Sequence, residues 1–309
     1  MYLGIDGGGT KTAFALGDAQ GRVLARHEEG SLYYLEIGLD GVEATLRRGA
    51  AAVLAAAGVE AGALCGVYVG LPAFGEDSAL QPRLEALPGR VFPGVANGCG
   101  CDMHCSWAGS LAGRDGISVI AGTGSMAYGE HRGRTARAGG WGELIGDEGS
   151  AYWIAREGMN LFSRMSDGRA GRGPLHQLVV NRLQLKEDLD LCAHVYGDGA
   201  ALRRTFAQFA PLIDEAARTG DEQAAAIFTR GASELVQCVL AVRRSLGVPD
   251  RIVLPVSHTG GVFSGTSLMV DAFRAALKSA STPFEYRPPL HEPAFGAALY
   301  ATRLAGQRS

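Results

Sequence analysis

The segment VANGCGCDMHCSWAG contains the side chains best suited to chemistry: Cys99, Cys101, Asp102, His104 and Cys105. Thiols and an imidazole could hold a metal, but a tetrahedral zinc site usually draws on two separated ligand pairs, and no second pair is nearby in sequence. The spacing of the cysteines also differs from the Cys-x-x-Cys pattern of redox and metal motifs. We therefore favour one catalytic carboxylate, Asp102, with the cysteines as small packing residues, and keep a metal or iron–sulfur site as the alternative.

A second group of candidates lies in LGIDGGGTKT, where Asp6 ends a short apolar strand and glycines follow. Without side chains, successive backbone N–H groups can face an anion, and Thr10, Lys11 and Thr12 add side-chain donors. A Walker A loop needs Gly-Lys adjacent and a helix next, whereas here Thr10 intervenes and a strand follows. No G-x-G-x-x-G opens a helix after this strand, which argues against a dinucleotide-binding fold. The turn is predicted to bind phosphate, with a plain glycine-rich hairpin as the alternative.

The same pattern recurs in the second half of the chain. ISVIA leads into GTGS, MAYGE, the polar turn HRGR and a third extended stretch, as YLGID leads into GGGTKT, TAFALGD and RVLARHEEG. Two phosphate-type turns would then face one another across a cleft. The repeat predicts a duplicated α/β fold with two lobes. The second lobe is expected to begin near residue 114.

The hydrophobic periodicity of the remaining chain predicts helices and buried strands. The expected strands are short apolar runs bounded by proline and glycine. The segment DEGSAYWIA is expected to begin a helix, which places Asp147 and Glu148 at a helix N-terminus. Helices are expected at 38–57, across most of 147–247, at 267–280 and at 292–306, and strands at 66–72, 90–97 and 251–261.

Composition argues against several classes of partner. The chain of 309 residues has a formal net charge of -3 and 20% charged residues, so it lacks the basic field that recruits nucleic acid or anionic lipid. No run of roughly eighteen apolar residues is present, and the 6 cysteines do not make a disulfide scaffold over this length. We expect a cytoplasmic protein that binds a small molecule, with no nucleic-acid or membrane partner.

Five motifs in order resemble one known family: LGIDGGGTKT, AGTGS, GGWGELIGDEGSAYWIA, TGGVF and EPAFGAALYA. Together they are similar to the N-acetylglucosamine kinase group of the BadF/BadG/BcrA/BcrD-type ATPases, within the superfamily of acetate and sugar kinases, heat-shock ATPases and actin. The resemblance covers essentially the whole chain, and GGWGxxxGDEGSAYWI is its most specific part. It implies two ribonuclease-H-like lobes, bound MgATP and a homodimer. The first lobe would comprise residues 1–113 and 293–309, to which the C-terminal helix returns, and the second residues 114–292.

The same resemblance implies transfer of the γ-phosphoryl group of ATP to a hydroxyl of N-acetylglucosamine, with the 6-hydroxyl as the expected acceptor. Three alternatives stay open: a glucosamine kinase, an ATPase that activates a partner enzyme through a cysteine-bound cluster, and a sugar-binding sensor without catalysis. The presence of Asp6, Thr10, Asp102 and Thr123 argues against the sensor.

Roles follow from the resemblance position by position. Asp102 would be the general base, and Asp6 would hold Mg²⁺ through water. Sugar contacts would come from Tyr33, Asp102, Thr123, Gly139, Gly140, Asp147 and Glu148. Contacts to ATP would come from Asp6, Gly8, Gly9, Thr10, Lys11, Gly122, Thr123, Gly124, Gly260 and Gly261.

The chain departs from the family pattern at two places. Family members often read Asn-Asp directly, whereas GCGC separates Asn97 from Asp102, so either the loop carries an insertion or Asn97 is not the matching asparagine. Tyr33 or Tyr34 stands where the family has an asparagine that reaches the sugar, and its bulk would reshape the pocket. Asp147 and Glu148 also have a simpler explanation, because acidic residues stabilise a helix N-terminus.

Overall fold

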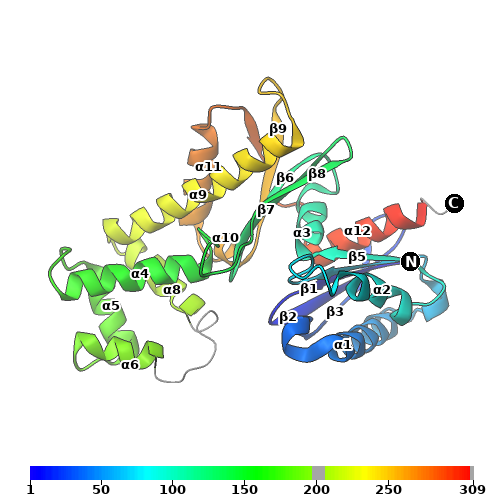
Figure 1. Cartoon of the computed structure of the whole chain (residues 1–309), viewed down its shortest axis with the longest axis horizontal. Helices are drawn as coiled ribbons and strands as arrows, with labels where there is room; N and C mark the ends of the chain where they lie inside the picture. The colour runs from blue at the N-terminus through cyan, green and yellow to red at the C-terminus, as the bar shows by residue number, and fades with distance from the viewer. Residues whose placement is uncertain (197–205, 307–309) are drawn as a thin grey trace. The chain divides into compact units, whose positions relative to one another are not determined.

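The computed structural model describes residues 1–196 and 206–306, and the chain divides into two compact units. Unit 1 comprises Met1–Ser118 and Arg287–Ser309, and unit 2 comprises Val119–Tyr286. One sheet has the strand order β3-β2-β1-β4-β5 and the other β10-β9-β6-β7-β8 (Figure 1). The two orders are equivalent, because in each sheet three consecutive strands are followed by two strands added on the side of the first. The predicted duplicated α/β fold is confirmed.

The strands of the first sheet meet unit 1's helices on both faces. The strand β1 is antiparallel to β2 and parallel to β4, which is parallel to β5. The carboxyl ends of β1, β4 and β5 therefore lie at one edge. Figure 1 shows α1 and α2 on one face and α3 and α12 on the other. The bounds are β1 Tyr2–Gly7, β2 Lys11–Gly17, β3 Val23–Gly30, β4 Gly66–Leu71, β5 Ala96–Cys101, α1 Tyr34–Ala57, η1 Ala61–Ala63, α2 Gln81–Val91, α3 Asp102–Leu111 and α12 Pro293–Gly306.

Strand alternation explains how these helices pack. Leu3 and Ile5 are fully buried in a core cluster that includes Val42 and Leu46 of α1. Between them Gly4 faces the opposite side, where a Cβ atom would collide with the backbone of α12. A glycine on that face therefore lets a helix lie directly against the sheet.

Two expectations for unit 1 are corrected. The strand expected at 90–97 is wrong: α2 continues through Val91, and β5 begins only at Ala96. The apolar pair Val91 and Phe92 ends a helix and faces the core rather than forming a strand. The helix expected from residue 38 starts at Tyr34 and is interrupted at Gly38, whose φ of 68° and ψ of 168° are not helical.

The second sheet is accompanied by the helices expected between residues 147 and 247. The segment 197–205 of that expectation lies outside the described residues. A short strand, β10, was not foreseen. The bounds are β6 Gly116–Ala121, β7 Ser125–His131, β8 Arg134–Gly139, β9 Leu254–Thr259, β10 Phe284–Tyr286, α4 Ala151–Ser166, α5 Pro174–Leu183, η2 Asp188–Asp190, α6 Leu191–Tyr196, α8 Ala210–Arg218, α9 Glu222–Leu246, α10 Gly261–Gly265 and α11 Ser267–Lys278.

The long helix α9 is the one helix in residues 1–196 and 206–306 whose length and apolar composition would suffice to cross a membrane. It packs against β7, β8 and α11 within unit 2. Residues such as Leu235 and Val239 are fully buried there, and a core helix satisfies the same criterion of length and composition.

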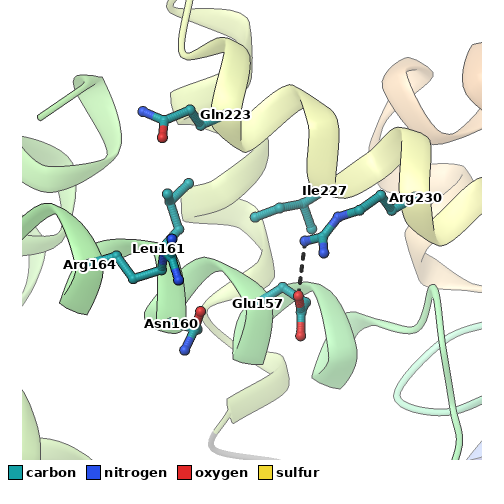
Figure 2. Close-up of a pocket in the computed structure, with 7 residues that line it drawn as sticks. All are labelled: Glu157, Asn160, Leu161, Arg164, Gln223, Ile227 and Arg230. Atoms are coloured by element: carbon teal, nitrogen blue, oxygen red, sulfur yellow. Dashed lines mark hydrogen bonds and ion pairs between the residues drawn. The ribbon is translucent and has the colours of Figure 1, made fainter. Parts of the chain in front are cut away.

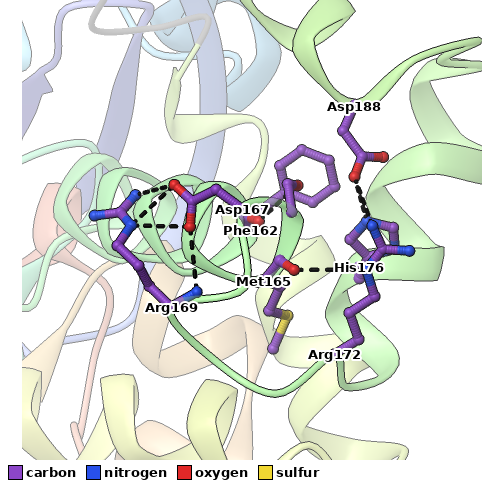
Figure 3. A network of polar contacts seen from close by, with 8 residues as sticks. Phe162, Met165, Asp167, Arg169, Arg172, His176 and Asp188 are labelled. Carbon is purple, nitrogen blue, oxygen red and sulfur yellow. Dashed lines mark hydrogen bonds and ion pairs between the residues drawn. The ribbon is translucent and has the colours of Figure 1, made fainter.

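Polar contacts hold the helices of unit 2 together. His176 of α5 stacks on Phe162 of α4, and its Nε2 lies 2.8 Å from Asp188 Oδ2 (Figure 3). The hydrogen bond from His176 lowers the pKa of Asp188. The buried carboxylate of Asp221 accepts N–H groups from Leu175 at the start of α5 and from Gln223 and Ala224 at the start of α9. One side chain therefore caps α9 and fixes α5 beside it.

Candidate functional site

Asp102 occupies the junction between β5 and α3. The strand ends at Cys101 and the helix begins at Asp102. The GCGC segment continues β5 in unbroken register with β4, from Gly98 opposite Tyr68 to Cys101 opposite Leu71. These residues are therefore regular strand.

The glycines of GCGC make room for α3 and α12. A Cβ at Gly100 would collide with His104 of α3, and one at Gly98 would come within 2.9 Å of Leu304 of α12. Asn97, at the other end of β5, donates its side-chain N–H to the carbonyl of Val95 at 2.8 Å. Asn97 is therefore held away from the strand end that carries Asp102.

The soft ligands of this segment turn toward different partners. The Cys99 thiol donates to the carbonyl of Leu84 in α2 at 3.4 Å, whereas the buried Cys105 thiol donates to that of Ile5 in β1 at 3.8 Å. His104 Nδ1 lies 2.6 Å from the hydroxyl of Tyr68. Among the residues that the structure describes, no three His, Cys, Asp or Glu side chains are placed to hold a metal. Burial raises the pKa of Cys99 to about 12 and lowers that of His104 to about 4, which keeps the thiol protonated and the imidazole neutral.

Asp6 and Asp102 lie at the same edge of the first sheet. Asp6 pairs with Gly70 of β4, and Gly70 with Gly100 of β5. A Cβ at Gly70 would lie 2.5 Å from Cys105 Sγ and 3.1 Å from Asp102 Cα, so this glycine lets α3 approach the strand ends. Sequence reasoning missed Gly70, although GVYVGLP carries the signal of a glycine inside an apolar strand.

The environment disfavours charge on both carboxyl groups. Burial raises the pKa of Asp6 well above its usual value, and the neighbouring Asp102 raises it further, while Lys11 lowers it. Burial also raises the pKa of Asp102, and the hydrogen bond from Cys101 opposes that shift. A pair of part-buried carboxylates with raised pKa values is suited to proton transfer or to a nearby cation.

The first glycine turn is closed by its own backbone. The N–H of Gly8 donates to the carbonyl of Lys11 at 3.0 Å and is used within the turn. The Lys11 ammonium lies 2.5 Å from Glu28 Oε1, and the Thr12 hydroxyl donates to the carbonyl of Gly30 at 2.6 Å. Thr12 is fully buried, so its predicted role as a donor to phosphate is wrong. Gly9 and Thr10 are exposed at the tip of the turn.

The structure distinguishes the two tyrosines. The Ser31 hydroxyl donates to the carbonyl of Gly8 at 3.2 Å and accepts the N–H of Tyr33 at 2.9 Å, which ties Tyr33 to the glycine turn. Tyr34 is buried and donates to the carbonyl of Ala73 at 3.2 Å. Tyr33 is therefore the tyrosine beside the candidate site, and Ser31, which sequence reasoning missed, is the residue that holds it there.

In unit 2, the loop between β8 and α4 folds back onto the start of β7. Ser125 accepts the N–H of Gly140 at 3.0 Å, donates its own N–H to Asp147 Oδ1 at 3.2 Å and donates its hydroxyl to the carbonyl of Glu148 at 2.7 Å. The N–H of Ala151 donates to the carbonyl of Gly122 at 2.8 Å. Ser125, which directly follows the glycine turn after β6, therefore holds the loop of Asp147 and Glu148 against that turn.

The expected helix N-terminus at Asp147 and Glu148 is wrong. The helix α4 begins at Ala151, and Ser150 caps it by accepting the N–H of Trp153. Asp147 is buried and has a left-handed φ of 60°, an uncommon conformation for a residue other than glycine. Because Asp147 lies in the loop before α4 and Ser150 caps the helix, stabilisation of a helix N-terminus does not explain the acidic residue at this position.

A second glycine pair lies beside the first turn of unit 2. Gly260 follows β9 with a φ of 100°, and a Cβ there would collide with the backbone of Ala121. Gly261 has open space where a side chain would be. The Thr259 hydroxyl is buried without a hydrogen-bond partner in the described chain. The open position at Gly261 beside an unsatisfied buried hydroxyl fits a site whose ligand supplies the missing contacts.

A groove of about 200 Å³ lies elsewhere in unit 2, between α4 and α9. Figure 2 shows Arg230 of α9 reaching Glu157 of α4, with a distance of 2.9 Å between Nη2 and Oε2. None of the predicted site residues lines this groove.

The predicted residues therefore form one group in each unit. In unit 1 the strand ends and adjoining loops carry Asp6, Gly8, Gly9, Thr10, Lys11, Tyr33 and Asp102. In unit 2 the corresponding positions carry Gly122, Thr123, Gly124, Gly139, Gly140, Asp147, Glu148, Gly260 and Gly261.

Two equivalent α/β sheets with glycine turns after their first strands define the class of actin-like ATPase folds, to which sugar kinases also belong. A model of the BadF/BadG/BcrA/BcrD ATPase family matches residues 3–301, and the chain belongs to this family.

Relatives match over nearly the full chain. An N-acetyl-D-glucosamine kinase of Dictyostelium discoideum is 28% identical, and an N-acetylmuramic acid/N-acetylglucosamine kinase of Clostridium acetobutylicum is 29% identical, each over 97% of both chains. The structure of a candidate N-acetylglucosamine kinase from Chromobacterium violaceum has a TM-score of 0.73 at 27% identity and covers 98% of both chains.

Proposed function

We propose that this protein transfers the γ-phosphoryl group of MgATP to the 6-hydroxyl of N-acetylglucosamine, with Asp102 as the general base. The protein is an ATP-dependent sugar kinase: it has the family's fold over its whole length, and the relatives that cover nearly all of it act on amino sugars. The observation that supports the mechanism best is that Asp6 near the end of β1 and Asp102 after β5 lie at the same end of the sheet, with only β4 between the two strands.

Asp102 has the properties that a base for a sugar hydroxyl needs. It is held at the first position of α3, and burial raises its pKa toward the range in which a carboxylate accepts a proton readily. In this role the carboxylate accepts a hydrogen bond from the hydroxyl and orients its oxygen for in-line attack. It takes the proton as the bond between the sugar oxygen and the γ-phosphorus forms and the bond from the γ-phosphorus to the leaving ADP breaks.

The residues of unit 1 fit a bound magnesium nucleotide. Asp6 faces the negative charge of Asp102, and a cation held through water would offset the cost of two carboxylates in this environment. Gly9 and Thr10, at the exposed tip of the turn, would contact phosphate, together with Gly8 and Lys11. When bound, MgATP supplies the phosphoryl group and the cation that neutralises its charge.

Unit 2 would bind the rest of the nucleotide and part of the sugar. Gly122, Thr123 and Gly124 would contact phosphate. The adenosine would lie against Gly260 and Gly261, and Gly261 has open space at its Cβ position. Asp147 and Glu148 would accept sugar hydroxyls beside the backbone of Gly139 and Gly140. On this basis unit 1 is the sugar and phosphate lobe and unit 2 the nucleotide lobe. A cytoplasmic homodimer is proposed from the resemblance to the kinase group alone.

Tyr33 bears on the choice of sugar. Its position beside the glycine turn, where an asparagine is expected, would change the shape of the pocket around the amino substituent. Glucosamine is therefore the second candidate acceptor. The alternative of an ATPase activator is disfavoured, because Cys99 and Cys105 donate to carbonyls of α2 and β1 rather than converging on one cluster.

The test is a panel of sugars with MgATP. Purified protein is mixed with N-acetylglucosamine, glucosamine, N-acetylmuramic acid or glucose, ADP release is measured, and phosphorus NMR identifies the phosphorylated hydroxyl. We expect turnover with N-acetylglucosamine and a 6-phosphate product. ADP release that no sugar stimulates would refute the kinase, and a preference for glucosamine would refute the choice of substrate.

A further inference from the structure

We infer that Cys101 is a positioning residue for the general base: its thiol donates a hydrogen bond to Asp102 and fixes the carboxylate for the sugar hydroxyl. This inference rests on the proposed function, because it assigns a role relative to the base. It assigns Cys101 a role other than metal binding or core packing.

The contact is direct. Cys101 Sγ lies 3.0 Å from Asp102 Oδ1, within the range of a thiol hydrogen bond to oxygen. The two residues are adjacent at the end of β5, where Cys101 pairs with Leu71 and has extended φ and ψ angles of −62° and 145°. Cys101 is the residue that precedes the first turn of α3, the position from which a side chain commonly satisfies polar groups at a helix start.

The bond runs opposite to ordinary helix capping. A capping side chain accepts backbone N–H groups, whereas the thiol here donates to the carboxylate that follows it. Backbone N–H groups of Met103 and of Asp102 itself also act on this carboxylate. The thiol therefore restrains one carboxylate oxygen, Oδ1, from the strand side, and the sugar hydroxyl would approach the other oxygen.

The surrounding groups make such a donor useful. Asp102 faces Asp6 at the end of β1, Glu76 in the segment after β4, and the buried thiol of Cys105 on α3. Burial and the negative charge of Glu76 raise the pKa of Asp102, while the hydrogen bond from Cys101 lowers it. The hydrogen bond from Cys101 thus opposes the effect of burial on the Asp102 pKa without adding a positive charge to the site.

Cys99 provides a matched control within the same strand. Its thiol also donates a hydrogen bond, but to the carbonyl of Leu84 on the side of the sheet that carries α2. Both thiols donate a hydrogen bond, but only that of Cys101 donates to the carboxylate of Asp102. Cys99→Ala should leave kcat within about twofold of wild type, as substitutions away from functional groups usually do.

The experiment compares Cys101→Ala, Cys101→Ser and Cys99→Ala in the sugar-kinase assay. Cys101→Ala should lower kcat roughly three- to tenfold and change the KM for ATP by less than about twofold, because a thiol is a weak donor and acts only on the base. Cys101→Ser keeps a donor at this position and should restore kcat to within about twofold of wild type. In an Asp102→Asn background, Cys101→Ala should have no further effect on kcat, since the base is already lost.

A spectroscopic measurement tests the hydrogen bond between the Cys101 thiol and Asp102 independently of activity. The Raman S–H band that disappears in Cys101→Ser should lie at lower frequency than that of a free thiol, and it should shift upward in Asp102→Ala. If the band does not respond to Asp102→Ala, or if Cys101→Ala keeps full kcat, the positioning role is wrong. A serine variant as slow as the alanine variant would also overturn it. Should no sugar be phosphorylated, the proposed function fails, and the Raman band still shows whether the thiol engages Asp102.

Discussion

Asp6 and Asp102 are placed where their ionised forms lower the stability of the fold but suit catalysis. Both carboxyl groups stand at strand ends where burial raises the pKa, and the proximity of Asp102 raises that of Asp6 further. An ionised pair in this environment destabilises the empty protein, while bound substrate and cation would relieve the repulsion. Their placement is therefore explained by function better than by folding.

A first prediction concerns Asp6→Asn. The raised pKa means that the folded chain holds the Asp6 proton more tightly than the unfolded chain does. The resulting stabilisation is complete below the pKa of an unfolded aspartate, about 4, and is lost as pH rises through the folded pKa. At pH 7 the substitution should therefore raise the free energy of unfolding, while MgATP-dependent turnover falls by roughly 10²-fold through loss of charge positioning. Urea unfolding at pH 4 and pH 7, together with the kinase assay, measures both effects.

Asp18→Asn is a control for which we expect the opposite change in the free energy of unfolding at pH 7. Hydrogen bonds from the backbone and side chain of Arg22 lower the pKa of Asp18, so its contribution is present at neutral pH and lost on acidification. This variant should be less stable than wild type at pH 7 and should keep its activity. If Asp6→Asn behaved like Asp18→Asn in the unfolding experiment, the account of the Asp6 environment would be contradicted.

At the level of elements, amphipathic periodicity and apolar runs were sufficient to predict most helices and strands. They failed at β5, because ANGCGC has none of the branched or aromatic residues that mark a strand. The glycines of β5 leave room for α3 and α12 to pack against the strand. This requirement depends on tertiary contacts, so the local sequence pattern does not show it. The start of α4 was misplaced because the acidic pair suggested an N-terminus, whereas the cap is Ser150.

A second prediction tests the packing of α12 on α3. A Cβ at Gly296 would collide with the backbone of Cys105 and Gly109 in α3, and backbone atoms in two packed helices cannot move aside easily. Gly296→Ala should lower the free energy of unfolding by about 1–3 kcal/mol, the usual cost of overpacking. Gly306→Ala, in the last turn of the same helix and with open space at the Cβ position, should change it by less than about 0.5 kcal/mol. Equal stability of the two variants in urea would show that the helices are not packed this closely.

For the whole molecule, the duplication was predictable because two strand–turn–strand patterns recur around GGGT and GTGS, and both sheets have equivalent strand order. The grouping of site residues was less predictable. Ser31 ties Tyr33 to the glycine turn through a hydrogen bond to Gly8, and Ser125 holds the loop of Asp147; both hydrogen bonds join segments far apart in sequence. The contact between Cys101 and Asp102 joins neighbours in sequence, but their side-chain directions appear only once β5 and α3 are built.

The most direct test of the central claim is the rate of phosphoryl transfer to N-acetylglucosamine in Asp102→Asn. Asparagine keeps the size of the side chain and can still hold the sugar hydroxyl, but it cannot take the proton. Single-turnover measurements with saturating MgATP should show the rate falling by roughly 10²–10⁴-fold, the scale of a positioned general base, with the affinity for sugar and nucleotide changing far less. An Asp102→Asn enzyme that phosphorylates the sugar at the wild-type rate would contradict the account.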